Sequence, residues 1–188
     1  MESKRDKLLD AAIQLFAADG FWNTSTASIA RAAGVANGTL FNCFASKDEL
    51  INAVYRELKQ RLLGAVTEAL PADGTLRQRL EASWRAVVLW ALENPVEHRL
   101  LDQLRMSEFV TSETRDAVAS DFAFIIGEMQ TALDRGELTA LPLPYHLEML
   151  FGQIAAQIGF LQGEGAETAD RDDLIAQGFE VWWRGVAV

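Results

Sequence analysis

A short polar stretch near position 37 has the residue types and spacing needed to bond to the bases of DNA. Asn37 and Gly38 begin a segment, from about Ala36 to Phe44, that is expected to form a short helix. The Asn37 side chain carries both a donor and an acceptor, which match the major-groove edge of adenine. When a helix of this kind enters the major groove, its N-terminal residues face the base edges. Asn37 is therefore a candidate for reading DNA sequence.

A second short helix, just before this segment, must hold it in position. Thr26 is the expected cap of that helix, and Ile29, Ala30 and Ala33 form its apolar face. Gly34 follows where the chain must reverse, because glycine adopts positive φ without a steric penalty. Two short helices joined by a glycine-bearing turn are typical of a helix-turn-helix.

Longer helices are expected on both sides of this pair. Apolar residues spaced at three and four predict a helix over residues 3–19, with Ser3 as its N-cap and its end at Gly20. Ser46 and Glu49 have the spacing of a capping box, which would start a further helix running to about Leu70. The residues expected to form the core of this N-terminal part are Leu9, Ile13, Phe16, Phe21, Ile29, Val35, Leu40 and Phe44.

The rest of the chain also has helical periodicity, without the alternation typical of strands. Breaks are expected at residues 71–74 and 141–144, and a loop is expected over residues 163–166. The helices expected here lie at about residues 75–94, 95–108, 112–135, 145–162 and 170–187. The predicted fold class is therefore all-α, with about nine helices in the whole chain.

The charge of the chain is distributed unevenly. The formal net charge is −10, yet residues 1–64 carry eight Lys or Arg against seven Asp or Glu. Residues 65–188 carry nine against twenty, so the excess of acid lies there. Because phosphate binding depends on local positive charge, any contact with DNA is expected in the N-terminal third.

Several classes of protein are not supported by the sequence. No stretch is apolar for long enough to span a membrane, and the single cysteine, Cys43, cannot form an internal disulfide. The chain has no Cys/His cluster for zinc, no phosphate-binding glycine-rich loop, and neither Gly-x-Ser-x-Gly nor His-Glu-x-x-His. We therefore expect a cytoplasmic protein that is not an enzyme and uses no metal or other cofactor.

A longer motif extends over both short helices and the start of the next one. It reads Ile29-Ala30-x-x-Ala33-Gly34-Val35-x-x-Gly38-Thr39-Leu40-Phe41-x-x-Phe44-x-Ser46-Lys47-Asp48-x-Leu50. This motif resembles the DNA-binding signature of the tetracycline-repressor (TetR) family of bacterial regulators. The resemblance implies a DNA-binding domain at residues 1–46 and a ligand-binding and dimerisation domain at residues 47–188, with the helix from Lys47 as the connector.

The resemblance also implies a function and a set of partners. We expect a ligand-responsive transcriptional repressor that binds a palindromic operator in double-stranded DNA as a homodimer and is released by a small organic effector. The positions that match DNA contacts of the family are Thr26, Asn37, Gly38, Thr39, Phe41, Asn42, Cys43 and Lys47. Phe41 stands where a tyrosine is frequent and Cys43 where a histidine or tyrosine is usual, so two hydrogen bonds to phosphate are missing.

Effector and dimer sites are expected in the body, as in the family. The candidate effector residues are Trp84, Val88, Trp90, His98, Leu101, Arg105, Met106, Phe109, Phe122, Ile126 and Phe151. Their aromatic content suits a flat or apolar molecule, although any one of them could equally be ordinary core. The candidate dimer residues on the last two helices are Gly152, Ala155, Ala156, Gly159, Phe179, Trp182 and Trp183. They could instead cover only the protomer's own core.

A second function remains open at this stage. The acidic body and the two missing phosphate contacts are also compatible with a helical module that binds a ligand or protein partner and has lost DNA binding. Salt-dependent binding to DNA would separate the two interpretations.

Overall fold

The computed structural model describes residues 3–163 and 170–188, and this part of the chain is almost entirely helical. The helices are α1 (Lys4–Asp19), α2 (Thr26–Ala32), α3 (Asn37–Cys43), α4 (Lys47–Ala69), α5 (Leu76–Glu93), α6 (Pro95–Arg105), α7 (Ser112–Asp121), α8 (Ala123–Asp134), α9 (Leu143–Gln162) and α10 (Arg171–Val186). None of these helices, within the described residues, is long and apolar enough to cross a membrane.

The predicted all-α class is confirmed, with ten helices rather than about nine in the described residues. The difference arises at Phe122, where the helix expected over residues 112–135 is interrupted. Its backbone lies at φ −98° and ψ 6°, outside the α-helical region, so α7 and α8 are separate helices. Of the loop expected at residues 163–166, all but Gly163 lies outside the described residues.

The chain forms two compact units. Unit 1 contains the residues up to Arg61 together with Asn94–Ser120, and unit 2 contains Leu62–Glu93 together with Asp121–Val188. Unit 1 therefore joins the helix-turn-helix to α6 and nearly all of α7, which lie far along the sequence. The predicted division after residue 46 concerns function and remains a prediction.

In unit 1, α1 packs against α2, α3 and α6 around an apolar core. Ser3 caps α1 as predicted, and its capping box with Asp6 is complete. Gly20 ends α1 with a φ of 80°, also as predicted. The predicted core is buried except for Val35, which is half-buried in the turn between α2 and α3.

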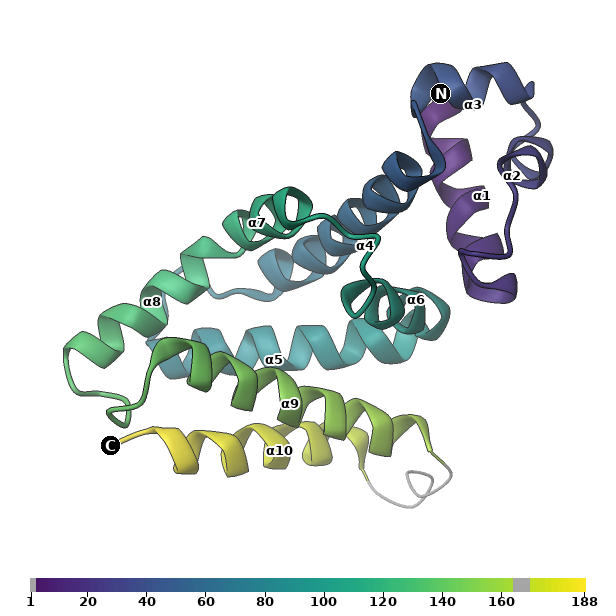
Figure 1. Cartoon of the computed structure of the whole chain (residues 1–188). Helices are drawn as coiled ribbons and strands as arrows, with labels where there is room; N and C mark the ends of the chain where they lie inside the picture. Colours follow the sequence, from purple (N-terminus) through teal and green to yellow (C-terminus); the bar gives the residue numbers. More distant parts are fainter. Residues whose placement is uncertain (1–2, 164–169) are drawn as a thin grey trace. The chain divides into compact units, whose positions relative to one another are not determined.

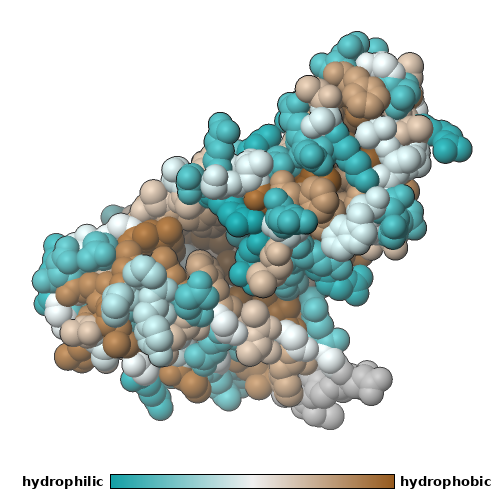
Figure 2. All heavy atoms as spheres, in the orientation of Figure 1, coloured by the Kyte–Doolittle hydropathy of each residue, from teal (hydrophilic) through white to brown (hydrophobic). Residues whose placement is uncertain are grey.

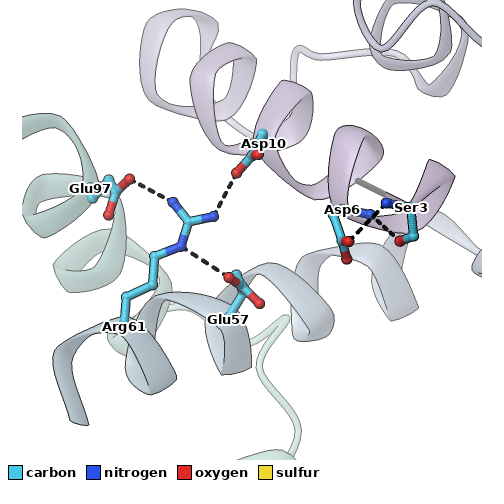
Figure 3. A network of polar contacts seen from close by, with 6 residues as sticks. All are labelled: Ser3, Asp6, Asp10, Glu57, Arg61 and Glu97. Atoms are coloured by element: carbon cyan, nitrogen blue, oxygen red, sulfur yellow. Dashed lines mark hydrogen bonds and ion pairs between the residues drawn. The ribbon is translucent and has the colours of Figure 1, made fainter. Parts of the chain in front are cut away.

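A single guanidinium joins three helices of unit 1 (Figure 3). Arg61 of α4 donates hydrogen bonds to Asp10 of α1 at 2.5 Å, Glu57 of α4 at 3.0 Å and Glu97 of α6 at 2.8 Å. Partial burial favours a lower pKa for Arg61, but these carboxylates outweigh it, so its pKa is raised and it stays charged. The network thus holds α1 and α6 to the same point of α4.

In unit 2, α5, α9 and α10 lie side by side (Figure 1). The buried Trp84 of α5 donates its Nε1–H to Oε1 of Gln157 at 2.6 Å. Nε2 of the same amide donates to the carbonyl of Leu174 at 2.7 Å. Trp84 also packs against Phe179 and Trp182 of α10, with ring centroids 5.9 and 6.1 Å away. One glutamine of α9 therefore ties α5 and α10 together within an aromatic core.

Helix α8 is only partly covered within unit 2. Apolar side chains gather at the surface where α8 lies in Figure 1, as Figure 2 shows. Phe124 is exposed, and Ile125 and Ile126 are half-buried, whereas Met129 and Ala132 are fully buried. Only the C-terminal half of α8 is therefore anchored in the core of unit 2.

We expect Gly178→Ala to destabilise unit 2, although alanine normally favours a helix over glycine by about 1 kcal/mol. A Cβ at this position would overlap the amide of Gln157 and displace it from its bonds to Trp84 and Leu174. A buried donor left without a partner costs about 1–3 kcal/mol, which exceeds the gain in helix propensity. Thermal unfolding followed by circular dichroism measures the change. Gly64→Ala, where the Cβ meets nothing within 4 Å, is the control and should be neutral or stabilising.

We expect Arg61→Met to lower the free energy of unfolding by about 1–2 kcal/mol, more than an exposed ion pair contributes. The methionine retains much of the apolar stem but leaves Asp10, Glu57 and Glu97 without their shared cation. Denaturant unfolding should compare it with Arg184→Met, which removes a more exposed pair with Glu180. Equal costs for the two variants would show that the Arg61 network has no special role.

Candidate nucleic-acid interface

The first helix of the helix-turn-helix is capped one residue earlier than predicted. Ser25, not Thr26, is the N-cap of α2, because its backbone is extended and its Oγ accepts a hydrogen bond from the Ser28 amide at 3.0 Å. Thr26 is the first helical residue and is half-buried. Its hydroxyl is not used for capping, so its predicted role toward phosphate does not compete with a cap.

The turn after α2 fixes the direction of α3. Gly34 has a φ of 67°, which an L-residue with a side chain rarely adopts. The Gly34 amide donates to the Arg31 carbonyl at 3.1 Å, and the Val35 amide donates to the Ala30 carbonyl at 2.9 Å. These bonds close the end of α2, as expected for a glycine C-cap, and direct the chain into α3.

Helix α3 presents the predicted recognition residues on its open side. Leu40 is buried beneath it, whereas Asn37 and Asn42 are exposed and the Phe41 side chain is 46% exposed. The remaining predicted contacts on α3 are Gly38, which is exposed, and Thr39 and Cys43, which are half-buried. The helix therefore offers an amide and an aromatic ring, one turn apart, on a surface that the core does not use.

Lys47 begins α4 next to this surface. Ser46 caps the helix, since its Oγ accepts from the Glu49 amide at 3.1 Å. The second bond of the predicted capping box differs. The Glu49 carboxylate accepts from the Ala45 amide at 2.7 Å and not from the amide of the cap residue, Ser46. The ammonium of Lys47 donates to the carbonyl of Trp22 at 3.2 Å. Lys47 is thus tied to the loop between α1 and α2.

The structure brings three aromatic residues together around that loop. Phe109, from the loop between α6 and α7, meets Phe21 edge-on with ring centroids 5.6 Å apart. It also stacks on Trp22 with centroids 6.5 Å apart and an interplanar angle of 17°. Sequence reasoning placed Phe109 in an effector pocket, but it packs in unit 1 against the helix-turn-helix. No local signal links positions so far apart in the chain.

Basic residues extend the positive charge of this region. Lys4, Arg5 and Lys7 are exposed on the first turn of α1. The guanidinium of Arg5 lies 5.2 Å from the ring centroid of Phe44, which places this turn beside the end of α3. Charge suited to phosphate is therefore close to the recognition helix.

The predicted effector residues are divided between the two units. Five of them belong to unit 1 and six to unit 2. Trp84, Val88, Trp90 and Leu101 are buried, whereas Arg105, Met106 and Phe151 are exposed. A hollow of about 730 Å³ in unit 2 is lined instead by the loop before α5, by Arg79, and by α8 residues that include Phe124, Gly127 and Glu128. A smaller one of about 310 Å³ lies in unit 1 between α4 and α7.

His98, one of the candidate effector residues, lies largely buried on α6. Burial lowers its pKa, and the Asp102 carboxylate, 3.8 Å away, opposes this shift without cancelling it. His98 is therefore neutral near pH 7 and able to donate or accept a hydrogen bond. Among residues 3–163 and 170–188, no cluster of His, Cys, Asp and Glu could hold a metal ion.

The predicted dimer residues divide into two groups. Gly152, Ala155, Ala156 and Gly159 of α9 are all exposed. Phe179 and Trp182 of α10 are buried in the core of unit 2, and Trp183 is half-buried. The aromatic residues of α10 were expected at an interface because sequence alone shows too many of them for a protomer surface. The structure instead packs Phe179 and Trp182 against Trp84.

Comparisons with known proteins agree with this geometry. Residues 8–54 match the model of the bacterial regulatory proteins of the tetR family. A crystal structure from Shewanella sp. PV-4, provisionally assigned to the tetR family of transcription regulators, is 32% identical and has a TM-score of 0.89 over 99% of both chains. The chain belongs to the TetR family. It is a DNA-binding transcriptional regulator with a helix-turn-helix and not an enzyme.

Other relatives of this TetR-family chain match over most of its length. The HTH-type transcriptional regulator SrpR of Pseudomonas putida is 29% identical over 178 residues, which cover 90% of this chain and 78% of SrpR. A TetR family regulator from Marinobacter aquaeolei VT8 has a TM-score of 0.88 at 24% identity, covering 98% of this chain and 95% of the other. At that identity, the second likeness supports the fold alone.

Substitutions at three of the candidate DNA-binding residues, two on α3 and one at the start of α4, should have distinct effects on DNA binding. Asn37→Ala should cost about 1–3 kcal/mol per site on the cognate operator and relax the preference at one base pair. Lys47→Ala should weaken binding evenly across sequences and lower the salt slope by roughly one per helix-turn-helix. Cys43→Ala should change little, whereas alkylation of Cys43 should block binding by its bulk. Binding of a selected operator is measured by fluorescence anisotropy at several salt concentrations. If all three variants match the parent, α3 is not the reading helix.

Proposed function

We propose that this TetR-family regulator is a repressor that binds a palindromic operator as a homodimer and leaves it when a small organic effector binds. The observation that carries the proposal is the exposed surface of α3, where Asn37 and Phe41 stand free of the core. Asn37 reads a base, and Phe41 makes apolar contact with a thymine methyl. Thr26 and Lys47 contact phosphates on either side and set the register of α3 in the groove.

The dimer forms through the small residues of α9. Gly152 and Gly159 are two exposed glycines seven residues apart on one face of α9, although glycine inside a helix costs about 1 kcal/mol relative to alanine. A Cβ on Gly152 or Gly159 would meet nothing within 4 Å in the protomer. Ala155 and Ala156 lie between them on the same exposed face. Small residues at this spacing let a second helix approach closely, which supports a two-fold interface that includes α9.

A palindromic operator follows from this two-fold symmetry. Two copies of α3 related by a two-fold axis read two half-sites about one helical turn, or a multiple of one, apart. The effector acts from the body, where the hollow beside α8 has the volume that small organic ligands occupy. Phe122 and Ile126, two of the predicted effector residues, are half-buried at and near the start of this helix.

We expect Gly152→Arg combined with Gly159→Arg to convert the protein to a monomer and to weaken operator binding with it. Light scattering at micromolar concentration should give a mass near 20.8 kDa for the variant and about twice that for the parent. Circular dichroism should show a protomer fold that is retained, since the new side chains enter open space. Gly64→Arg is the control and should leave the dimer intact. A monomeric parent would contradict the proposal.

A further inference from the structure

Lys47 is a flexible side chain whose ordering opposes DNA binding. Fixing a lysine costs up to about 2 kcal/mol in side-chain entropy, so a lysine that is already held binds phosphate more tightly. Here the ammonium is held by one hydrogen bond, to the Trp22 carbonyl at 3.2 Å. An ammonium has three donors, so two remain for a phosphate. The position of the Trp22 carbonyl therefore determines the position of the Lys47 ammonium.

The loop that carries this carbonyl is positioned by a ring from a distant segment. Trp22 is 62% exposed, and its ring contacts two others, Phe21 edge-on at 3.8 Å between centroids and Phe109 in a stack. The preceding residue, Phe21, is fully buried and meets Phe109 edge-on. Aromatic pairs of this kind contribute beyond the area they bury. Phe109 thus contacts both residues that determine where the Trp22 carbonyl lies.

Phe109 is in turn fixed to the start of α4 by a buried amide. Asn52 is 5% exposed, and its Nδ2 donates to the carbonyls of Asp48 and Phe109, each at 2.8 Å. Its Oδ1 accepts from the Thr111 amide at 3.0 Å. The loop between α6 and α7 is therefore bonded to the second turn of α4, directly after the turn that begins with Lys47. All of these residues belong to unit 1.

We infer that Phe109 is a positioning residue for DNA binding, which acts through the Trp22 loop on Lys47. The inference rests on the proposed contact between Lys47 and a DNA phosphate. It gives the loop between α6 and α7 a part in operator affinity, although this loop does not belong to the helix-turn-helix. A change in that loop would alter the affinity without touching any group that contacts DNA.

The test is a double-mutant cycle on operator affinity. Phe109→Ala should weaken binding of the parent to a selected operator by up to about thirty-fold, the equivalent of the side-chain entropy of one lysine. In a Lys47→Ala background, the same substitution should have no further effect, since the group it positions is gone. Phe109→Tyr retains the ring and should restore the affinity. Met106→Ala, at a 76% exposed side chain on the same loop, is the matched control and should bind like the parent.

Trp22→Ala repeats the test without risk to the core, because that side chain is largely exposed. It keeps the carbonyl but removes the stack on Phe109, so it should also lose affinity only when Lys47 is present. Equal losses from Phe109→Ala with and without Lys47 would overturn the inference, and so would an unchanged affinity in the parent background. If Lys47→Ala itself leaves the affinity and salt slope unchanged, the proposed phosphate contact fails instead. The two failures are therefore distinguishable.

Discussion

Unit 1 depends on one cation shared by three carboxylates. Asp10 stands on α1, whose apolar face supports α2 and α3, and Glu97 stands on α6, which follows in the sequence only after α5. Without Arg61, these groups and Glu57 would repel one another across the point where the helices meet. With Arg61 present, directional hydrogen bonds as well as apolar contacts hold α1 and α6 to α4. The recognition helix therefore rests on a support that includes part of the body.

The packing of unit 1 extends beyond the helix-turn-helix motif. The functional division expected at residue 46 follows the helix-turn-helix motif, whereas the packing joins that motif to α6, most of α7 and the loop between them. Arg61 makes the connection at one end of this region, and Asn52 and Phe109 make it at the other. An effector that moved α6 or its following loop would therefore act on residues in direct contact with α1 or with the loop between α1 and α2.

The features that could be predicted from the sequence depend on contacts within a few residues. Ser3, Gly20 and Gly34 carry out their expected tasks because caps and turns are local. The shift from Thr26 to Ser25 shows the limit of such signals, since adjacent Ser and Thr both suit a cap. The packing of Phe109 on Phe21 could not be predicted, because it joins segments that share no periodicity. The interruption between α7 and α8 at Phe122 could not be predicted either, because the apolar spacing of a helix continues through it.

Glycines within helices differ in whether the space beside them is occupied, and this difference is visible only in the structure. Gly178 is required by the protomer itself, because Gln157 occupies the space where its side chain would be. Gly152 and Gly159 have open space around them, so nothing in the protomer accounts for their cost to α9. The sequence alone does not separate Gly178 from Gly152 and Gly159, since all three lie within helices. The structure separates them: Gly178 lies against Gln157 in the core, whereas the α9 face is exposed in the protomer, which is why the dimer proposal rests on α9 and not on the tryptophans of α10.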